Sequence, residues 1–351
     1  MGLLVEACSG GGGSQLSSAG TFDGGDATSL VGSDASSDAS ETADALIEDA
    51  KGKDVASVPV GIPFGPYNLY GGGEAGPSSW ETPMSVGTAS FTLSSDYADA
   101  TGIVLRINSA RQRKLKMLTH MTGGSHSIYI TNGKFDLAKW KAGMDTYKTS
   151  AIMSAVSTAV ADGTIIGNSV MDEPNHDSWG GVMTKAIVDQ MCAYQKGIFP
   201  TLPAGVVHNH DALEPTKSYA VCDFIVDQYG HRLTMGDIAA FRDAALALGT
   251  RDHHAIFFSL NILDGGIQDT NNNGAWECPT PSTEGQGTYS PNCRMTADQV
   301  RTFGLTLGAA GCGLTMWRYD AAFMARADNQ AAFLDVAASL ALLPMTTCKR
   351  W

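Results

Sequence analysis

The sequence of 351 residues predicts an α/β fold, a (β/α)8 TIM barrel preceded by a flexible N-terminal segment. From residue 58 onward, short runs of β-branched and aromatic residues alternate with helical segments, as in a parallel sheet built from βα units. Residues 58–351 also exceed the roughly 250 residues that such a barrel needs. A doubly wound sheet is the alternative, but the Gly-rich phosphate loop expected after its first strand is missing.

Composition narrows the possible partners. Apolar residues make up 43% of the chain, which is ordinary for a globular protein with a sizeable core. The formal net charge is −13 and the pI is about 4.9, and no basic run could neutralise phosphates, so nucleic acid is not expected as a partner. No apolar run approaches the roughly 20 residues that cross a bilayer.

Residues 1–57 are predicted to form a separate segment. Leu4, Val5, Glu6 and Ala7 precede Cys8, and this resembles a truncated and degenerate bacterial lipoprotein signal with Cys8 as the lipidated residue. A Gly-, Ser- and Asp-rich acidic linker follows, which would hold the barrel at the surface of a bacterial cell. The alternatives are a chance cysteine before a linker, or a tail that mediates self-association.

The first half of the barrel is expected to contain four strands. They are assigned to residues 60–67, 84–93, 115–124 and 165–172, and the second of these is the least clear. Helices are expected over residues 96–113 and 135–148 and in a following segment that ends at residue 160.

The second half repeats the alternation more plainly. Strands are expected within residues 204–213, 222–230, 254–266 and 312–320. Helices are expected over residues 183–198, 236–248, 296–307 and 329–342.

The stretch 165–175 is the most informative part of the chain. A buried strand runs into the carboxylate pair Asp172 and Glu173, and Pro174 stops it. Because proline favours extended geometry in the preceding residue, Glu173 is expected to be extended at the C-terminal end of the strand. Loops after parallel strands build active sites, so Glu173 is a catalytic candidate. The alternative is an acid that only caps the next helix.

Polar and aromatic residues gather at the other predicted strand ends, whereas the helix interiors are plainer. The expected lining of an active face comprises Tyr67, Asn68, His120, Asp172, His208, His210, Asp211, Asp227, Tyr229, Asn261, Asp264, Trp317, Arg318 and Asp320.

These residues resemble those of TIM-barrel glycoside hydrolases, in which one strand ends Asn-Glu-Pro or Asp-Glu-Pro and a Trp ends the last strand. The matches are Asp172-Glu173-Pro174 and Trp317. The resemblance implies a polysaccharide substrate, no cofactor for catalysis, and Glu173 as the general acid/base. It also implies that Trp317, Trp179 or Tyr67 stacks on a sugar. A second carboxylate about 5.5 Å away would predict retention, and one at roughly 6.5 to 9.5 Å inversion.

The chain departs from that pattern because no later strand ends in Glu. Asp264 is nearest to the expected place of a second catalytic carboxylate, with Asp227 and Asp320 as competitors. Two interpretations stay open. The barrel is either a divergent hydrolase that uses Asp, or a non-catalytic surface protein that binds glycans or assembles with its own copies.

His208 and His210 suggest a further alternative, a metal-dependent hydrolase. Two residues apart on a strand, they would point to the same side, as in barrels that bind a metal through His-x-His. The pair is otherwise polar lining of a sugar-binding cleft. His253 and His254 precede a strand and are expected at the surface.

Two further features concern stability. The segment 269–277 resembles a calcium loop with oxygen donors at Asp269, Asn271, Asn273 and Glu277, so a structural Ca²⁺ is expected; an Asn-rich turn is the alternative. Six cysteines of the barrel are expected to form disulfides in an exported protein, rather than buried thiols. The favoured pairs are Cys278 with Cys293, Cys312 with Cys348, and Cys192 with Cys222.

Overall fold

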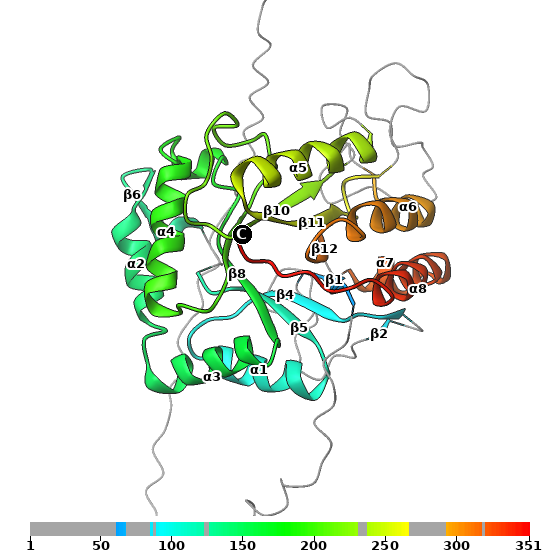
Figure 1. Ribbon diagram of the computed structural model, residues 1–351, viewed down its shortest axis with the longest axis horizontal. Coiled ribbons are helices and arrows are strands. Elements are labelled where there is room, and N and C mark those ends of the chain that lie inside the picture. Colours follow the sequence, from blue (N-terminus) through cyan, green and yellow to red (C-terminus); the bar gives the residue numbers. More distant parts are fainter. Residues whose placement is uncertain are drawn as a thin grey trace, which may run out of the picture. The chain divides into compact units, whose positions relative to one another are not determined.

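The computed structural model describes residues 61–67, 85–86, 89–122, 126–230, 237–266, 293–317 and 320–351 (Figure 1). Several predicted features lie outside these residues. They are the segment 1–57 with Cys8, the loop 269–277, and Asn68, Cys278 and Arg318.

An eight-stranded parallel sheet forms the centre of the molecule and confirms the predicted (β/α)8 barrel. In chain order its strands are β1 (Phe64–Pro66), β4 (Leu93–Tyr97), β5 (Lys116–His120), β8 (Ile165–Asp172), β9 (Ala204–Val207), β10 (Phe224–Tyr229), β11 (Ala255–Asn261) and β12 (Leu314–Trp317). The pairing order is β1-β12-β11-β10-β9-β8-β5-β4. A parallel bridge between Tyr67 and Ser95 links β1 to β4 and nearly closes the barrel.

Helices surround the strands (Figure 1). They are α1 (Ile103–Gln112), α2 (Leu137–Asp145), α3 (Ser150–Ala161), α4 (Lys185–Ile198), α5 (Ile238–Asp252), α6 (Ala297–Gly308), α7 (Ala321–Met324) and α8 (Ala327–Ala341). Side chains of Thr149, Thr184, Asp237 and Thr296 accept hydrogen bonds from backbone N–H groups of the first turn and so fix where four of these helices begin. Within the described residues, no helix combines the length and apolar character of a membrane span.

Short elements fill the connections. Two small hairpins pair β2 (Ser85–Val86) with β3 (Ala89–Ser90) and β6 (Ile130–Thr131) with β7 (Lys134–Phe135). The 3₁₀ helices are η1 (His126–Tyr129) and η2 (Asp177–Trp179).

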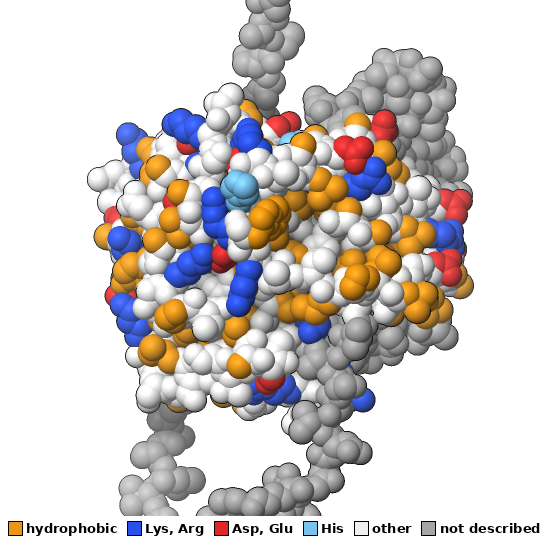
Figure 2. Space-filling view, viewed as in Figure 1, with side chains coloured by type: hydrophobic (Ala, Val, Ile, Leu, Met, Phe, Trp, Pro, Cys, Tyr) orange, Lys and Arg blue, Asp and Glu red, His pale blue; other side chains and the backbone are white. Residues whose placement is uncertain are grey.

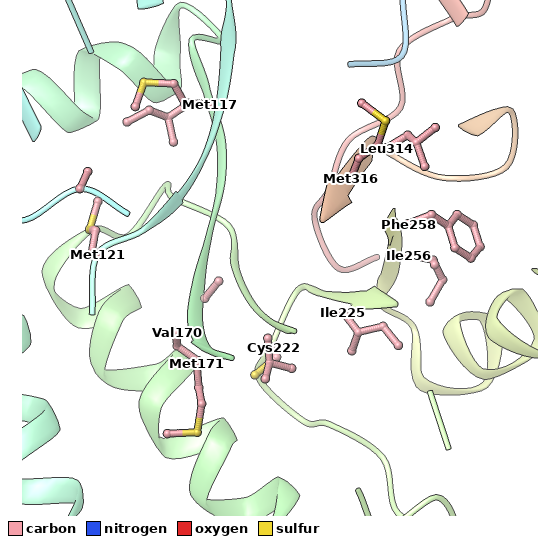
Figure 3. Close-up of a cluster of buried hydrophobic side chains, with 14 of the residues drawn as sticks. Met117, Met121, Val170, Met171, Cys222, Ile225, Ile256, Phe258, Leu314 and Met316 are labelled. Carbon is pink, nitrogen blue, oxygen red and sulfur yellow. The ribbon is translucent and has the colours of Figure 1, made fainter. Parts of the chain in front are cut away.

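Strand alternation divides the core into two layers, because successive side chains of a strand point to opposite faces. Leu118, Phe224, Val226 and Phe257 belong to the cluster inside the barrel. The residues between them on the same strands face the helices, and Figure 3 shows part of this outer layer, including Met117, Ile225, Ile256, Phe258 and Leu314.

The predicted helix over residues 96–113 was wrong at its start. Strand β4 continues through Tyr97, and α1 begins only at Ile103. Asp96 is buried and pairs with Arg106 of α1 at 2.7 Å, and Asp99 Oδ1 accepts hydrogen bonds from the N–H groups of Thr101 and Gly102. The second barrel strand is therefore 93–97, not 84–93.

His254 was also placed wrongly by the sequence. It is fully buried immediately before β11, whereas His253 is exposed and ends α5 in the left-handed region. Burial lowers the pKa of His254 to about 4, so its ring is neutral at physiological pH.

Disulfides and the C-terminal segment secure the N-terminal end of the barrel. Cys192 pairs with Cys222 and Cys312 with Cys348, which confirms two of the predicted pairs. Cys293 is also disulfide-bonded, and its expected partner Cys278 lies outside the described residues. The last residues cross this end, where Lys and Arg side chains gather around the C-terminus (Figures 1 and 2).

We predict that Gly65→Ala destabilises the barrel at its closure. An added Cβ would lie 1.9 Å from the Leu93 carbonyl oxygen of the facing strand β4, so one strand must move. The free energy of unfolding should fall by roughly 3 kcal/mol, measured by denaturant unfolding.

Gly197→Ala is the matched control for Gly65→Ala. Gly197 lies in α4 with no atom within 4 Å of its added Cβ, so this change should alter the free energy by less than about 1 kcal/mol. Equal effects of the two substitutions would contradict the role given to Gly65.

Candidate active site

A cleft of about 450 Å³ lies at the C-terminal ends of the strands. This volume is in the range that holds small ligands. Its described lining contains Asp172, Glu173, Asn175, His176, Val207, His208, Asn209, Ala212, Gln228, Gly230, Asn261 and Trp317. Two smaller cavities of about 60 and 30 Å³ adjoin it, and Asp172 lines all three. Asp172 therefore lies at the centre of the candidate site.

Asp172 and Glu173 both line the cleft, although they are adjacent in sequence. Side chains of adjacent residues in a regular strand would point to opposite faces. Here the register of β8 shifts between Ser169 and Asp172, and Glu173 has φ +41°, in the left-handed region. The extended geometry predicted for Glu173 was therefore wrong, and this kink brings two carboxylates to one cleft.

Hydrogen bonds hold the kink from both sides. The Glu173 N–H donates to the Val207 carbonyl at 2.8 Å. The Glu173 carbonyl accepts from the His176 N–H at 2.8 Å and from Trp179 Nε1 at 2.9 Å. A non-glycine residue in this region costs about 1–3 kcal/mol, which these contacts must offset. Such strain is common at functional sites.

The environment of Asp172 favours its protonated form. Its side chain is exposed to the cleft, but the surrounding walls remove much of the bulk water. This desolvation, together with the nearby charge of Glu173, raises the pKa of Asp172 to about 7. A carboxyl group with that pKa can both donate and accept a proton near neutral pH.

Aromatic rings form one wall beside Asp172. Tyr67 and Trp317 stack with their ring centroids 5.3 Å apart and their planes 26° from parallel. The Tyr67 ring also meets His120 edge-on at 5.1 Å, and His120 Nε2 is hydrogen-bonded to Ser95 Oγ at 3.0 Å. Burial lowers the pKa of His120 to about 4, so this wall carries no positive charge at neutral pH.

Trp179 was expected to stack on a sugar, but it is not among the residues that line the 450 Å³ cleft. It is buried, packs edge-on against Phe135, and donates its indole N–H to the Glu173 carbonyl. Trp179 therefore supports the kink from behind.

The residue of β10 that lines the cleft is not one of those predicted. Gln228 lines the cleft, whereas its neighbours Asp227 and Tyr229 face the helices. Tyr229 packs against Phe241 and Phe303. Asp227 is fully buried and accepts from the His210 ring Nδ1 at 2.7 Å and the His210 backbone N–H at 3.1 Å.

Asp227 and His210 form an ion pair next to the cleft. Burial opposes the charge on His210, but the hydrogen bond and charge of Asp227 outweigh it and raise the pKa of His210. Burial raises the pKa of Asp227. Neither residue is among the cleft lining.

The other carboxylate candidates also lie outside the described lining of the cleft. Asn261 lines the cleft at the end of β11 and its Oδ1 accepts from the Asp264 N–H at 3.1 Å, whereas Asp264 itself is buried. Asp320 caps α7 by accepting from the Phe323 N–H at 2.8 Å. Asp172 is thus the carboxylate that the structure places with Glu173.

His208 is not arranged as a metal ligand. Strand β9 ends at Val207, so the two histidines do not share a strand. His208 Nδ1 is hydrogen-bonded to the Asn209 carbonyl at 2.6 Å and Nε2 to the Tyr219 hydroxyl at 2.7 Å. In the part of the chain that is described, no group of three His, Cys, Asp or Glu could hold a metal ion.

Sequence reasoning missed several lining residues. They are Asn175, His176, Asn209, Gln228 and Ser95. Counting alternate positions forward from the buried Phe224 would have identified Gln228, since Phe224, Val226 and Gln228 share one face. Ser95 was hidden by its assignment next to a helix start.

Comparisons with known proteins give likenesses of fold only. No family model and no curated protein matches the chain. Among solved structures, the chain is similar to native xylanase 10B from Thermotoga maritima, with 11% identity, a TM-score of 0.46, and coverage of 82% of this chain and 97% of that one. It is also similar to the GH113 beta-mannanase AaManA from Alicyclobacillus acidocaldarius, with 13% identity, a TM-score of 0.49, and coverage of 81% and 99%.

We predict that Asp172→Asn stabilises the protein at alkaline but not at acid pH. The pKa of Asp172 is about 7 in the folded protein and 3.8 in an unstructured chain, so the folded state holds an extra proton between these values. Wild-type stability therefore falls as pH rises from about 4 to 7, and the asparagine variant lacks this loss. Its Tm should match wild type near pH 3.5 and exceed it by at least about 2 °C at pH 8.

Asp177→Asn is the control for this pH series. Asp177 is exposed in the same loop, in η2, and does not line the cleft. Its replacement should leave the pH dependence of Tm unchanged. A Tm difference for Asp172→Asn that is the same at every pH would refute the environment described for Asp172.

Proposed function

We propose that this protein is a glycoside hydrolase-like barrel that cleaves glycosidic bonds with Asp172 and Glu173. The observation that carries the proposal is that the kink in β8 turns both carboxylates into one cleft, beside the Tyr67–Trp317 wall. Most glycoside hydrolases catalyse this reaction with a pair of Asp or Glu side chains in one cleft.

The two carboxylates have different roles in this proposal. Asp172, with a pKa near neutral, is the general acid that protonates the glycosidic oxygen as the bond breaks. Glu173 also lines the cleft; in this proposal its side chain stabilises positive charge at the sugar carbon and assists the attack of water. The motif predicted that Glu173 is the acid/base, whereas this proposal gives the role of general acid to Asp172.

The rest of the lining supports a glycan as the substrate. Trp317 offers an aromatic face, and Asn175, Asn209, Gln228 and Asn261 offer amide donors and acceptors to sugar hydroxyls.

The two disulfides support an extracellular location for the barrel. Lipidation of Cys8, calcium bound by residues 269–277 and self-association through the N-terminal segment remain predictions, since those residues lie outside the described part.

A second candidate function is glycan binding without catalysis. It is favoured by the position of Asp227, Asp264 and Asp320, since none of these lines the described cleft and each could have supplied a carboxylate from a different strand. The two candidates share the cleft and its aromatic wall and differ only in turnover.

Glu173→Gln and Asp172→Asn test the proposed reaction. We expect each to lower kcat on the cleaved polysaccharide by about 10²–10⁴-fold, since each removes a group acting in the transition state. Reducing-end release from β-linked xylan, mannan, glucan and chitin would be measured, with Asp177→Asn as the control of unchanged activity.

The binding and catalytic functions separate in the same experiment. If the wild-type protein binds a polysaccharide but releases no reducing ends, and neither variant alters binding by more than a few-fold, catalysis is excluded and the binding function stands.

A further inference from the structure

A side pocket of about 60 Å³ opens from the cleft at Asp172, between strands β5 and β8. Tyr129, Trp140 and Trp179 line it, together with His120 and Thr122. Because Asp172 lines both the pocket and the cleft, a group in the pocket would be attached to a sugar positioned at the proposed acid.

The size of the pocket limits what it can hold. A single water needs about 10–15 Å³ of such volume, so about 60 Å³ accepts a group of a few heavy atoms. The neighbouring cleft, at about 450 Å³, is several times larger and accommodates a sugar ring. The pocket therefore suits a substituent of the ring.

The walls of the pocket are rigid because their polar atoms are already bound. Trp140 Nε1 donates to Thr122 Oγ1 at 2.9 Å and to the Val170 carbonyl at 3.0 Å. Thr122 Oγ1 in turn donates to the Val170 carbonyl at 3.1 Å. With the Trp179 indole N–H bound to the Glu173 carbonyl, both tryptophans offer carbon surfaces to the pocket.

Tyr129 contributes a hydroxyl-bearing side chain to the pocket, whose lining also includes the polar side chains of Asp172, Ser169 and Thr122. It is 7% exposed, and no described residue is hydrogen-bonded to its hydroxyl. Burial raises its pKa to about 12, so the hydroxyl stays protonated and can donate or accept. A matching substituent has one apolar atom for the tryptophans and one hydroxyl for Tyr129.

We propose that this pocket receives the exocyclic hydroxymethyl group of a hexosyl unit, and so selects hexosyl over pentosyl substrates. The inference rests on the proposed function and adds the substrate class. A pentosyl unit has only hydrogen at this carbon, which leaves the tryptophan faces uncovered and the Tyr129 hydroxyl without its partner. A missing methylene alone costs roughly tenfold or more in kcat/KM, and a missing hydrogen-bonded hydroxyl more.

The test compares β-1,4-linked gluco-, manno- and xylo-oligosaccharides of equal length. The xylo series differs from the gluco series only in lacking the hydroxymethyl group. We expect kcat/KM for the better hexosyl series to exceed that for the xylo series by at least about tenfold. Affinities of Glu173→Gln for the same uncleaved sugars, measured by calorimetry, report selection without turnover.

Tyr129→Phe tests the assigned contact, because it keeps the ring and removes only the hydroxyl. It should reduce the hexosyl to xylosyl ratio by at least about fivefold, with an unchanged fold checked by circular dichroism and Tm. Ile128→Ala is the matched control, since Ile128 is its exposed neighbour, and this variant should keep the wild-type ratio.

The outcomes distinguish the two proposals. Equal or preferred use of xylo-oligosaccharides, or a ratio that Tyr129→Phe leaves intact, overturns the hydroxymethyl pocket while hydrolysis stands. Selective binding of hexosyl sugars without cleavage supports the pocket and refutes catalysis. If no oligosaccharide is bound or cleaved, both proposals fail.

Discussion

The left-handed backbone of Glu173 is the constraint on which the candidate site depends. In a regular strand one of Asp172 and Glu173 would face the helices, and the cleft would have a single carboxylate. The kink is held by Val207 on the neighbouring strand and by Trp179 on the following 3₁₀ helix. The site is therefore a property of three chain segments, and the Asp-Glu-Pro motif alone does not determine it.

The same buried contacts connect the carboxylates to the side pocket. Trp179 contributes its indole N–H to the Glu173 carbonyl and its ring to the pocket wall. Trp140 and Thr122 are fixed to the Val170 carbonyl two residues before Asp172. A change in the packing of either tryptophan would therefore alter the pocket and the position of the carboxylates together.

The alternation of strand and helix segments explains which features could be predicted from the sequence. Runs of β-branched and aromatic residues, separated by helical segments, identified the eight-stranded parallel barrel and most element positions, because strands covered on both faces are rich in apolar residues. It was harder to predict which residues of β10 face the cleft. Asp227 and Gln228 are adjacent and both polar, so polarity does not show which of them points inward. The hydrogen bond between His210 and Asp227 offsets part of the desolvation cost of this pair, which allows a polar residue to face the helices.

Other misassignments have equally local causes. Asp96 can lie in a buried strand because Arg106, ten residues ahead, pairs with it, and no short-range pattern shows such a pairing. The backbone of Glu173 departs from the preference of residues before proline because tertiary hydrogen bonds outweigh it. The sequence therefore identified the chemical groups of the site more reliably than their orientations.

Contacts that stabilise the fold lie at the N-terminal end of the barrel, and the candidate active site lies at the C-terminal end. At the N-terminal end, the Cys312–Cys348 disulfide and hydrogen bonds from Arg350 Nη1 to the Tyr219 carbonyl and from the Trp351 N–H to the His253 carbonyl tie the last residues to the sheet. Strain at Glu173 lies at the opposite end, where the loops need not carry the fold. A barrel secured in this way can keep two like charges side by side in its cleft. Desolvation by the cleft walls is the larger cause of the near-neutral pKa of Asp172, and the adjacent charge of Glu173 is the smaller one.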